Sequence, residues 1–176
     1  EMYPGADDTL VDRHRGWLEP RYLDPATGQL VFSFRSFLIR SGGLTILVDT
    51  CVGNDKNRPH RDVWHRQKFP WMDNLNALGV TPEEIDVVMC THLHVDHVPV
   101  ISAGQARMVK GDHEIGAGIW IEPSPGHTPG HVSLNVRQGD AHGVFCGDMM
   151  HHPIQVPEPA LYSIFCHDPV QSCATR

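Results

Sequence analysis

The sequence lacks any long hydrophobic run, and it is poor in basic residues. No stretch approaches the roughly 18 apolar residues that a membrane-spanning helix needs, so no membrane partner is expected. Its 14 Lys and Arg stand against 21 Asp and Glu, which gives a net charge of −7. Binding to nucleic acid needs clustered cations that displace counterions, so no nucleic-acid partner is expected either.

Paired cysteines are also missing, because the five cysteines are odd in number and form no CxxC motif. This pattern argues against a disulfide framework and favours reduced thiols in a reducing compartment. The first residues show neither the basic nor the apolar region of a signal peptide. We therefore expect a cytoplasmic protein, with an exported precursor as the alternative should the natural chain begin earlier. Residues 1–176 are long enough to form a single domain without disulfide support.

Local patterns predict a mostly β chain with few helices. Residues 30–39 and 44–48 are apolar runs on either side of a Ser-Gly-Gly turn, which is typical of a β-hairpin. The other expected strands are residues 86–90, 106–109, 118–122, 132–136 and 143–146. Helices are expected over residues 71–78, after the Thr-Pro-Glu-Glu opening at 81–84, and after Asp168-Pro169.

Metal-ligating side chains follow the strand expected at 86–90. His92, His94, Asp96 and His97 lie within six residues. In an extended segment residues two apart point the same way, so His92 and His94 can share one metal. A turn after His94 would aim Asp96 and His97 at a second metal. Imidazole and carboxylate without thiolate suit zinc, and one closed structural zinc site is the alternative.

Two further polar clusters lie at the ends of strands expected downstream. The turn-rich GHTPGH segment at 126–131 contains His127 and His131, one of which could complete a three-histidine site. The FCGD segment ends in Asp148, a carboxylate at a strand end, for which an ordinary turn aspartate is the alternative.

The motifs THLHVDH at 91–97, PGHTPGH at 125–131 and FCGD at 145–148 occur in this order, preceded by LVDT at 47–50. Together they resemble the metallo-β-lactamase superfamily over residues 30–155. The resemblance implies an α+β fold, a four-layer αββα sandwich with its metal site along one edge between the two sheets.

The resemblance also implies a site for two Zn²⁺ ions, with Mn²⁺, Fe²⁺ or Co²⁺ as alternatives. By position, the ligands are His92, His94 and His127 for the first metal, Asp96 and His97 for the second, and Asp148 as the bridge between them. His131 is expected to support its loop. In this family histidine at position 94 favours the hydrolytic branch, whereas glutamate there resembles the oxygen-reducing di-iron branch.

In the hydrolytic branch two cations move the pKa of a bridging water from 15.7 toward about 7, and the hydroxide attacks the substrate. Asp96, Asp148 and His151 are therefore the expected catalytic residues. His151 stands where the acyl-homoserine-lactone hydrolases carry tyrosine, and GDMMH at 147–151 resembles the branch of methyl-parathion hydrolase and related lactonases. By that similarity His151 or His152 lines the substrate pocket; a solvent-facing or ligand-supporting histidine is the alternative.

The sequence therefore predicts a dinuclear-zinc hydrolase of a small neutral ester or lactone, such as an acyl-homoserine lactone. Phosphotriester (organophosphate) hydrolysis and β-lactamase activity are the alternatives among enzymes. A degenerate metal-binding module is the non-enzyme alternative, because no histidine downstream of Asp148 is a convincing last ligand of the second metal.

The chain also departs from the family in length. His97 and His127 are 127 − 97 = 30 residues apart, which is shorter than usual in the family. We expect an internal segment after residue 98 and a C-terminal part to be missing. The expected partner is a small-molecule substrate, and a homodimer stays open.

Overall fold

The computed structural model describes residues 2–94, 96–97, 106–109 and 111–176. These residues fold into two compact units. Unit 1 comprises Glu1–Ser33, Glu122–Ser133 and Val144–Arg176, and unit 2 comprises Phe34–Ile121 and Leu134–Gly143. Residues 98–105, where an internal segment is expected to be missing, lie outside the described residues. No helix in the described part of the chain is long and apolar enough to cross a membrane.

The described residues form three α-helices. They are α1 (Asp8–Leu18), α2 (Trp71–Ala77) and α3 (Pro169–Thr175). The side chain of Asp168 accepts a hydrogen bond from the backbone N–H of Gln171, and Pro169 occupies the first turn of α3. The helices expected over 71–78 and after Asp168 are confirmed. Thr81 forms the expected capping box with Glu84. The segment that follows is only a short 3₁₀ helix, Pro82–Glu84, and not the expected α-helix.

A three-stranded sheet in unit 2 has the order β1–β2–β3, with strands Phe37–Ser41, Leu44–Val48 and Val87–Met89. The antiparallel hairpin of β1 and β2 is confirmed, and its two turn residues, Gly42 and Gly43, have positive φ angles of 59° and 79°. Strand β2 pairs in parallel with β3, with Val48 opposite Met89.

The first hairpin strand starts at Phe37, later than the residue 30 expected from sequence. Leu30 instead forms an isolated bridge with Leu23, and Leu30 and Phe32 pack against the core of unit 1. The apolar pattern of residues 30–36 therefore reflects packing of an irregular segment rather than a longer strand.

A second sheet has the order β4–β5–β6–β7. Its strands are His113–Gly116, Ile119–Pro123, Val132–Gln138 and Ala141–Phe145. Three of the strands expected downstream of residue 110 are thus confirmed within a few residues. The prediction of a strand over 106–109 is wrong, because those residues form no regular structure. Strand β4 was not predicted, because it is short and contains the charged residue Glu114.

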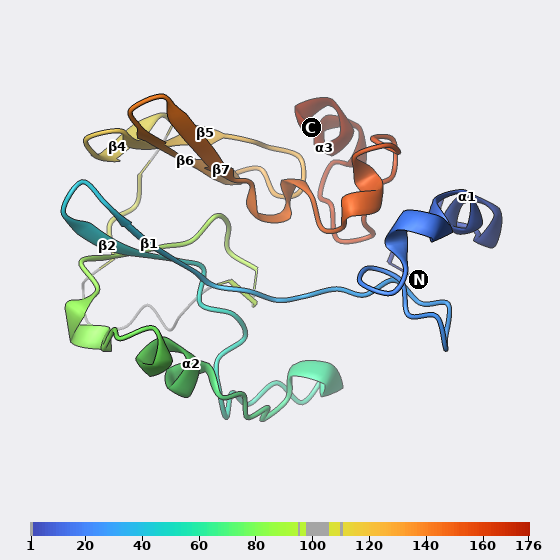
Figure 1. Cartoon of the computed structure of the whole chain (residues 1–176), viewed down its shortest axis with the longest axis horizontal. Helices are drawn as coiled ribbons and strands as arrows, with labels where there is room; N and C mark the ends of the chain where they lie inside the picture. The colour runs from blue at the N-terminus through green and yellow to red at the C-terminus, as the bar shows by residue number, and fades with distance from the viewer. Residues whose placement is uncertain (1, 95, 98–105, 110) are drawn as a thin grey trace. The chain divides into compact units, whose positions relative to one another are not determined.

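Within unit 2 the turns of the two sheets approach each other closely (Figure 1). A Cβ atom at Gly116 would lie 2.9 Å from Cδ1 of Leu44, and one at Gly42 would lie 3.5 Å from the carbonyl oxygen of Ala117. The buried apolar side chains of unit 2 come from both sheets and include Ile39, Ile46, Val48, Ile119, Ile121 and Leu134. Burial of these side chains stabilises the packing of one sheet on the other.

The core of unit 1 joins residues from both ends of the chain. Its buried members are Tyr3, Val11, Leu18, Leu23, Ile154 and Leu161. His152 is buried beside them, with Nε2 2.9 Å from the carbonyl oxygen of Tyr22 and Nδ1 accepting from the N–H of Ile154 at 3.2 Å. Burial lowers the pKa of His152 below its ordinary value, although the hydrogen bond to Tyr22 opposes this effect.

This burial predicts a pH-dependent contribution to stability. The unfolded chain protonates His152 more readily than the folded chain, so the contribution is complete above the ordinary pKa of about 6.5 and is lost as the pH falls through the lower folded-state pKa. We expect guanidinium unfolding midpoints, measured with a chelator from pH 7.5 to pH 5, to fall less in His152→Gln than in the unsubstituted protein. The exposed control His60→Gln should keep the original slope, and equal slopes in all three proteins would contradict the prediction.

Candidate functional site

In unit 2 the THLHVDH motif begins directly after β3, beside the end of β2. Because the two strands run parallel, Asp49 after β2 lies next to Thr91 after β3. Oδ1 of Asp49 accepts from the backbone N–H of Thr91 at 2.9 Å, and Oδ2 accepts from its hydroxyl at 2.9 Å. Both residues are buried, with 3% and 1% of their surface exposed. Asp49 therefore fixes the start of the motif.

Asp49 also orients His97, since its Oδ2 lies 2.9 Å from Nδ1 of that ring. The other ring nitrogen of His97, Nε2, lies 3.5 Å from Oδ2 of Asp96. A carboxylate against one nitrogen of a histidine is the usual arrangement for a ring that binds metal through its other nitrogen. Burial raises the pKa of the Cys90 thiol to about 11, so the thiol stays protonated and donates to the carbonyl oxygen of His97 at 3.3 Å.

The ring of His92 is held by Thr91, which is itself bonded to Asp49. Nδ1 of His92 lies 3.2 Å from the hydroxyl oxygen of Thr91, whose own proton is directed to Asp49. The hydroxyl therefore accepts from Nδ1–H, which leaves Nε2 of His92 as the nitrogen that could bind a cation. The His92 ring lies against the rings of His94 and His97, with centroid distances of 4.6 and 4.1 Å. Unit 2 thus brings the rings of His94 and His97 against that of His92, with Asp96 next to His97.

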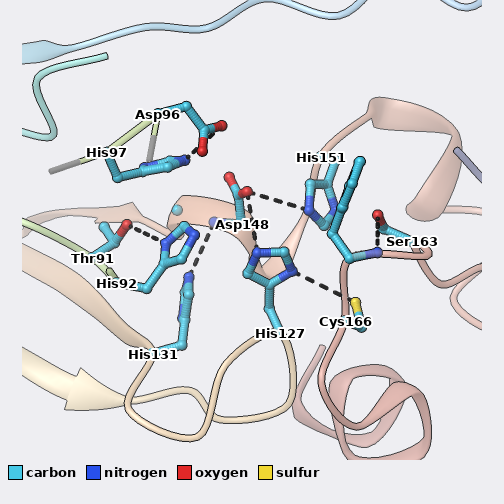
Figure 2. A network of polar contacts seen from close by, with 12 residues as sticks. Thr91, His92, Asp96, His97, His127, His131, Asp148, His151, Ser163 and Cys166 are labelled. Atoms are coloured by element: carbon cyan, nitrogen blue, oxygen red, sulfur yellow. Dashed lines mark hydrogen bonds and ion pairs between the residues drawn. The ribbon is translucent and has the colours of Figure 1, made fainter. Parts of the chain in front are cut away.

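In unit 1 a second group consists of His127, Asp148 and His151 (Figure 2). The Nε2 atoms of both histidines lie 3.4 Å from the same oxygen, Oδ2 of Asp148, and the ligand atoms of all three residues lie within 4.8 Å of one another. A direct N–H···O bond is normally shorter, about 2.7–3.2 Å. Two ligand atoms on a tetrahedral zinc ion, each about 2.1 Å from the metal, lie about 3.4 Å apart. The spacing in unit 1 therefore fits a shared divalent cation.

His131 supports this group without joining it, as expected from the sequence. Its Nε2 accepts from the backbone N–H of Asp148 at 3.1 Å, and its Nδ1 lies 2.8 Å from the hydroxyl of Ser124. Since Nε2 is the acceptor, Nδ1 carries the proton and donates to Ser124. The buried His131 therefore fixes the backbone that carries the Asp148 carboxylate.

The structure separates the two histidines that were candidates for the pocket. His152 is a core residue whose ring nitrogens both contact backbone groups. The ring of His151 lies 4.8 Å from that of His127, next to Asp148. The backbone N–H of His151 donates to Oε1 of Gln155 at 2.8 Å, and the same oxygen accepts from the hydroxyl of Tyr3. Of the two, His151 is therefore the one that could act in a site.

Several supporting residues were not expected from the sequence. Asp49 had been noted only as part of the LVDT motif, although its position after a strand parallel to β3 was a usable signal. Gln155 orients the backbone of His151, and Cys166 contacts the ring of His127, with Sγ 3.6 Å from Nδ1. No local pattern marks either residue.

A family model described as the metallo-beta-lactamase superfamily matches residues 35–98. Two curated relatives, N-acyl homoserine lactonases from Bacillus sp and Bacillus cereus, are 29% and 28% identical to this chain over 93 residues. Each alignment covers 36% of this chain and 37% of the relative. The chain therefore matches little more than a third of the length of these relatives.

Solved structures are similar over most of the chain. A probable metal-dependent hydrolase from Staphylococcus aureus matches with a TM-score of 0.77 and 17% identity, over 98% of this chain and 76% of that one. The hydrolase AbOPH of the beta lactamase superfamily matches with a TM-score of 0.75 and 21% identity, over 99% and 75%. An N-acyl homoserine lactone hydrolase with the product N-hexanoyl-L-homoserine at its catalytic metal centre matches with a TM-score of 0.67 and 16% identity, over 84% and 76%.

These likenesses confirm the α+β, metallo-β-lactamase fold that the motifs predicted. The family match falls on the β1–β3 region and reaches the end of the THLHVDH motif, where Asp49 and Thr91 hold the histidines in place. This chain therefore has the metallo-β-lactamase fold, and the model of that superfamily matches its residues 35–98.

Proposed function

We propose that this chain is a metal-dependent hydrolase that cleaves a small neutral ester or lactone with the help of two divalent cations, preferably zinc. One observation carries the proposal. Oδ2 of Asp148 lies 3.4 Å from Nε2 of His127, a spacing that suits two ligands of one cation better than a direct hydrogen bond.

The proposal assigns ligands as the family resemblance implies. They are His92, His94 and His127 for one cation, Asp96 and His97 for the other, and Asp148 for both. Local geometry supports this assignment in each unit separately. Asp49 and Thr91 occupy the Nδ1 sides of His97 and His92, so both rings keep Nε2 for a cation. His131 fixes the backbone of Asp148.

A bound divalent cation supplies a Lewis acid, which lowers the pKa of water from 15.7 to about 7 and polarises a carbonyl oxygen. The residues of the chain supply orientation. Asp49, Thr91 and His131 keep their partners in place before substrate arrives, so that little reorganisation is needed during the reaction. His151, next to Asp148 and anchored through Gln155, is proposed to line the substrate pocket and orient the substrate.

The choice of substrate class rests on the relatives. Two curated relatives are N-acyl homoserine lactonases, and one similar structure carries N-hexanoyl-L-homoserine at its metal centre. A lactone carbonyl is neutral and small, and its hydrolysis needs only an activated water and a polarised oxygen. We therefore favour lactones over phosphotriesters, which the same chemistry could also cleave.

The test is lactone turnover by the natural full-length protein. N-hexanoyl-homoserine lactone should be hydrolysed, a chelator should abolish turnover, and added Zn²⁺ should restore it. A zinc-loaded protein that is inert toward lactones and aryl esters would overturn the proposal. Hydrolysis of a paraoxon-type phosphotriester without lactone turnover would overturn the substrate class, and metal content far below two ions per chain would favour a degenerate binding module.

A further inference from the structure

Both ring nitrogens of His151 are buried without a hydrogen bond. Neither Nδ1 nor Nε2 has a hydrogen-bond partner among the described residues. The neighbouring His152 shows the opposite arrangement, since both of its ring nitrogens contact backbone groups. A buried polar atom without a partner costs free energy, so an ion or a water molecule is expected beside it.

The spacing at Nε2 of His151 distinguishes an ion from a water molecule. This atom lies 3.4 Å from Oδ2 of Asp148 but does not hydrogen-bond to it. Two atoms bonded to the same water molecule, each about 2.8 Å from it, lie about 4.6 Å apart at a tetrahedral angle. Two ligands of one zinc ion, each about 2.1 Å from the metal, lie about 3.4 Å apart. The observed distance therefore matches a shared cation and is too short for a bridging water.

His127 brings a second ring to the same oxygen, and Figure 2 shows the two rings converging on the Asp148 carboxylate. Nε2 of His127 also lies 3.4 Å from Oδ2 of Asp148, and the centroids of the two rings are 4.8 Å apart. All three residues belong to unit 1. Two imidazoles and one carboxylate are a ligand set that zinc uses in proteins. The group therefore has the donor atoms, as well as the spacing, of a cation site.

Contacts within unit 1 hold His151 in place. Its N–H donates to Oε1 of Gln155 at 2.8 Å, and Nε2 of Gln155 donates to the carbonyl oxygen of Leu161 at 2.9 Å. The ring of His151 packs against that of Tyr3, with centroids 6.4 Å apart and ring planes at 70°. Gln155 and Tyr3 are themselves buried. A ring that is already fixed loses little further freedom when it binds a cation, which favours its use as a ligand.

We propose that His151 is itself a metal ligand, and that its Nε2 holds one divalent cation together with Nε2 of His127 and Oδ2 of Asp148. The inference rests on the proposed function, because it adds a ligand to the cation that is assigned there to His127 and Asp148. The family resemblance does not supply this ligand. As a ligand, His151 lines the substrate pocket and orients the substrate through the cation that it holds.

The direct test is NMR of the natural full-length protein with nitrogen-15-labelled histidine, loaded with cadmium-113, a spin-active ion that binds the same kinds of ligand as zinc. Coordination gives a scalar coupling between the cadmium nucleus and each nitrogen bound to it. We expect this coupling at Nε2 of His151 as well as at Nε2 of His127. The experiment uses the unsubstituted protein, so no variant has to fold. Coupling at His127 without coupling at His151 would overturn the inference.

Zinc affinity, measured by competition with a chromophoric chelator, gives a second readout. Loss of a contact that only orients a ligand weakens metal binding by about 10- to 100-fold. His151→Ala should weaken it by more, because it removes a donor atom, and a loss within that range would contradict the inference. The matched control is His167→Ala, which removes an exposed side chain of unit 1 and keeps the backbone N–H that donates to His127. It should bind zinc like the unsubstituted protein.

The outcomes separate this inference from the proposed function. Lactone turnover without coupling at His151 would leave the proposed function in place and remove the additional ligand. Coupling at both histidines without lactone turnover would contradict the proposed function and leave the ligand role of His151 in place. Absence of coupling at both histidines would contradict both.

Discussion

Replacement of Asp148 by asparagine is expected to reduce kcat/KM for a lactone substrate by about 10³-fold. The substitution preserves the size of the side chain but removes its negative charge and replaces one oxygen by an NH₂ group. Oδ2 of Asp148 is the atom that both His127 and His151 approach at 3.4 Å, so the change removes the one anionic ligand of that group. Zinc content, measured by elemental analysis, should fall together with activity.

The matched control for this prediction is Asp112→Asn, which changes an exposed carboxylate to an amide in the same way. Its activity and zinc content should match those of the unsubstituted protein. Thermal unfolding in the presence of a chelator should be similar for all three proteins, since Asp148 is only half-buried. Activity of Asp148→Asn within a few-fold of the unsubstituted protein would show that Asp148 has no central role.

Gly126→Ala is expected to have the largest effect on stability, about 3 kcal/mol or more. A Cβ atom at this position would lie 2.3 Å from the backbone nitrogen of Ser172 and 2.4 Å from its Cα atom. The φ angle of Gly126, +129°, is also one that residues with a side chain rarely adopt. Both obstacles are backbone constraints, so a rotamer change cannot relieve them. The melting temperature should fall by roughly 10 °C.

The same motif offers a control, because Gly130→Ala places a Cβ atom in open space, with nothing within 4 Å. Its melting temperature should change by no more than about 2 °C. Gly126→Ala should also weaken zinc binding, because it pushes the backbone next to His127 away from the C-terminal segment. The N–H groups of His167 and Asp168 in that segment donate to the carbonyl oxygens of His127 and Gly126. Equal melting temperatures for the two glycine variants would contradict the close approach of this loop to α3.

Sequence patterns predicted the elements whose signals are local. The hairpin around Gly42-Gly43 and the helix after Asp168-Pro169 follow from turn and capping residues alone. Helix α1 was missed although Asp7 caps it and its buried residues Val11 and Leu18 are seven positions apart, a helical spacing. The prediction that the first hairpin strand begins at residue 30 is wrong, because an apolar pattern does not reveal whether a segment pairs with a neighbour or packs against a core.

For the candidate site, the motifs identified side chains but not what holds them. His92, His94, Asp96, His97, His127 and Asp148 were named because their residue types bind metal and follow strands. The supporting contacts join distant residues, such as Tyr3 with Gln155 and His127 with Cys166. Such pairings arise from tertiary packing, and nothing in the neighbouring sequence specifies them. The placement of the ligands with respect to two cations stays a prediction.

The Asp49–Thr91 bond has a consequence for how the chain chooses its strand alignment. Strands β2 and β3 present almost uniformly apolar residues to each other, with Ile46, Leu47 and Val48 opposite Val87, Val88 and Met89. A slip of one residue would exchange one aliphatic neighbour for another, so hydrophobic packing alone discriminates weakly between alignments. The slip would, however, leave the buried Asp49 carboxylate without the N–H and hydroxyl donors of Thr91, at a cost of several kcal/mol. The group that orients the histidines is therefore also what excludes misaligned pairings of this sheet.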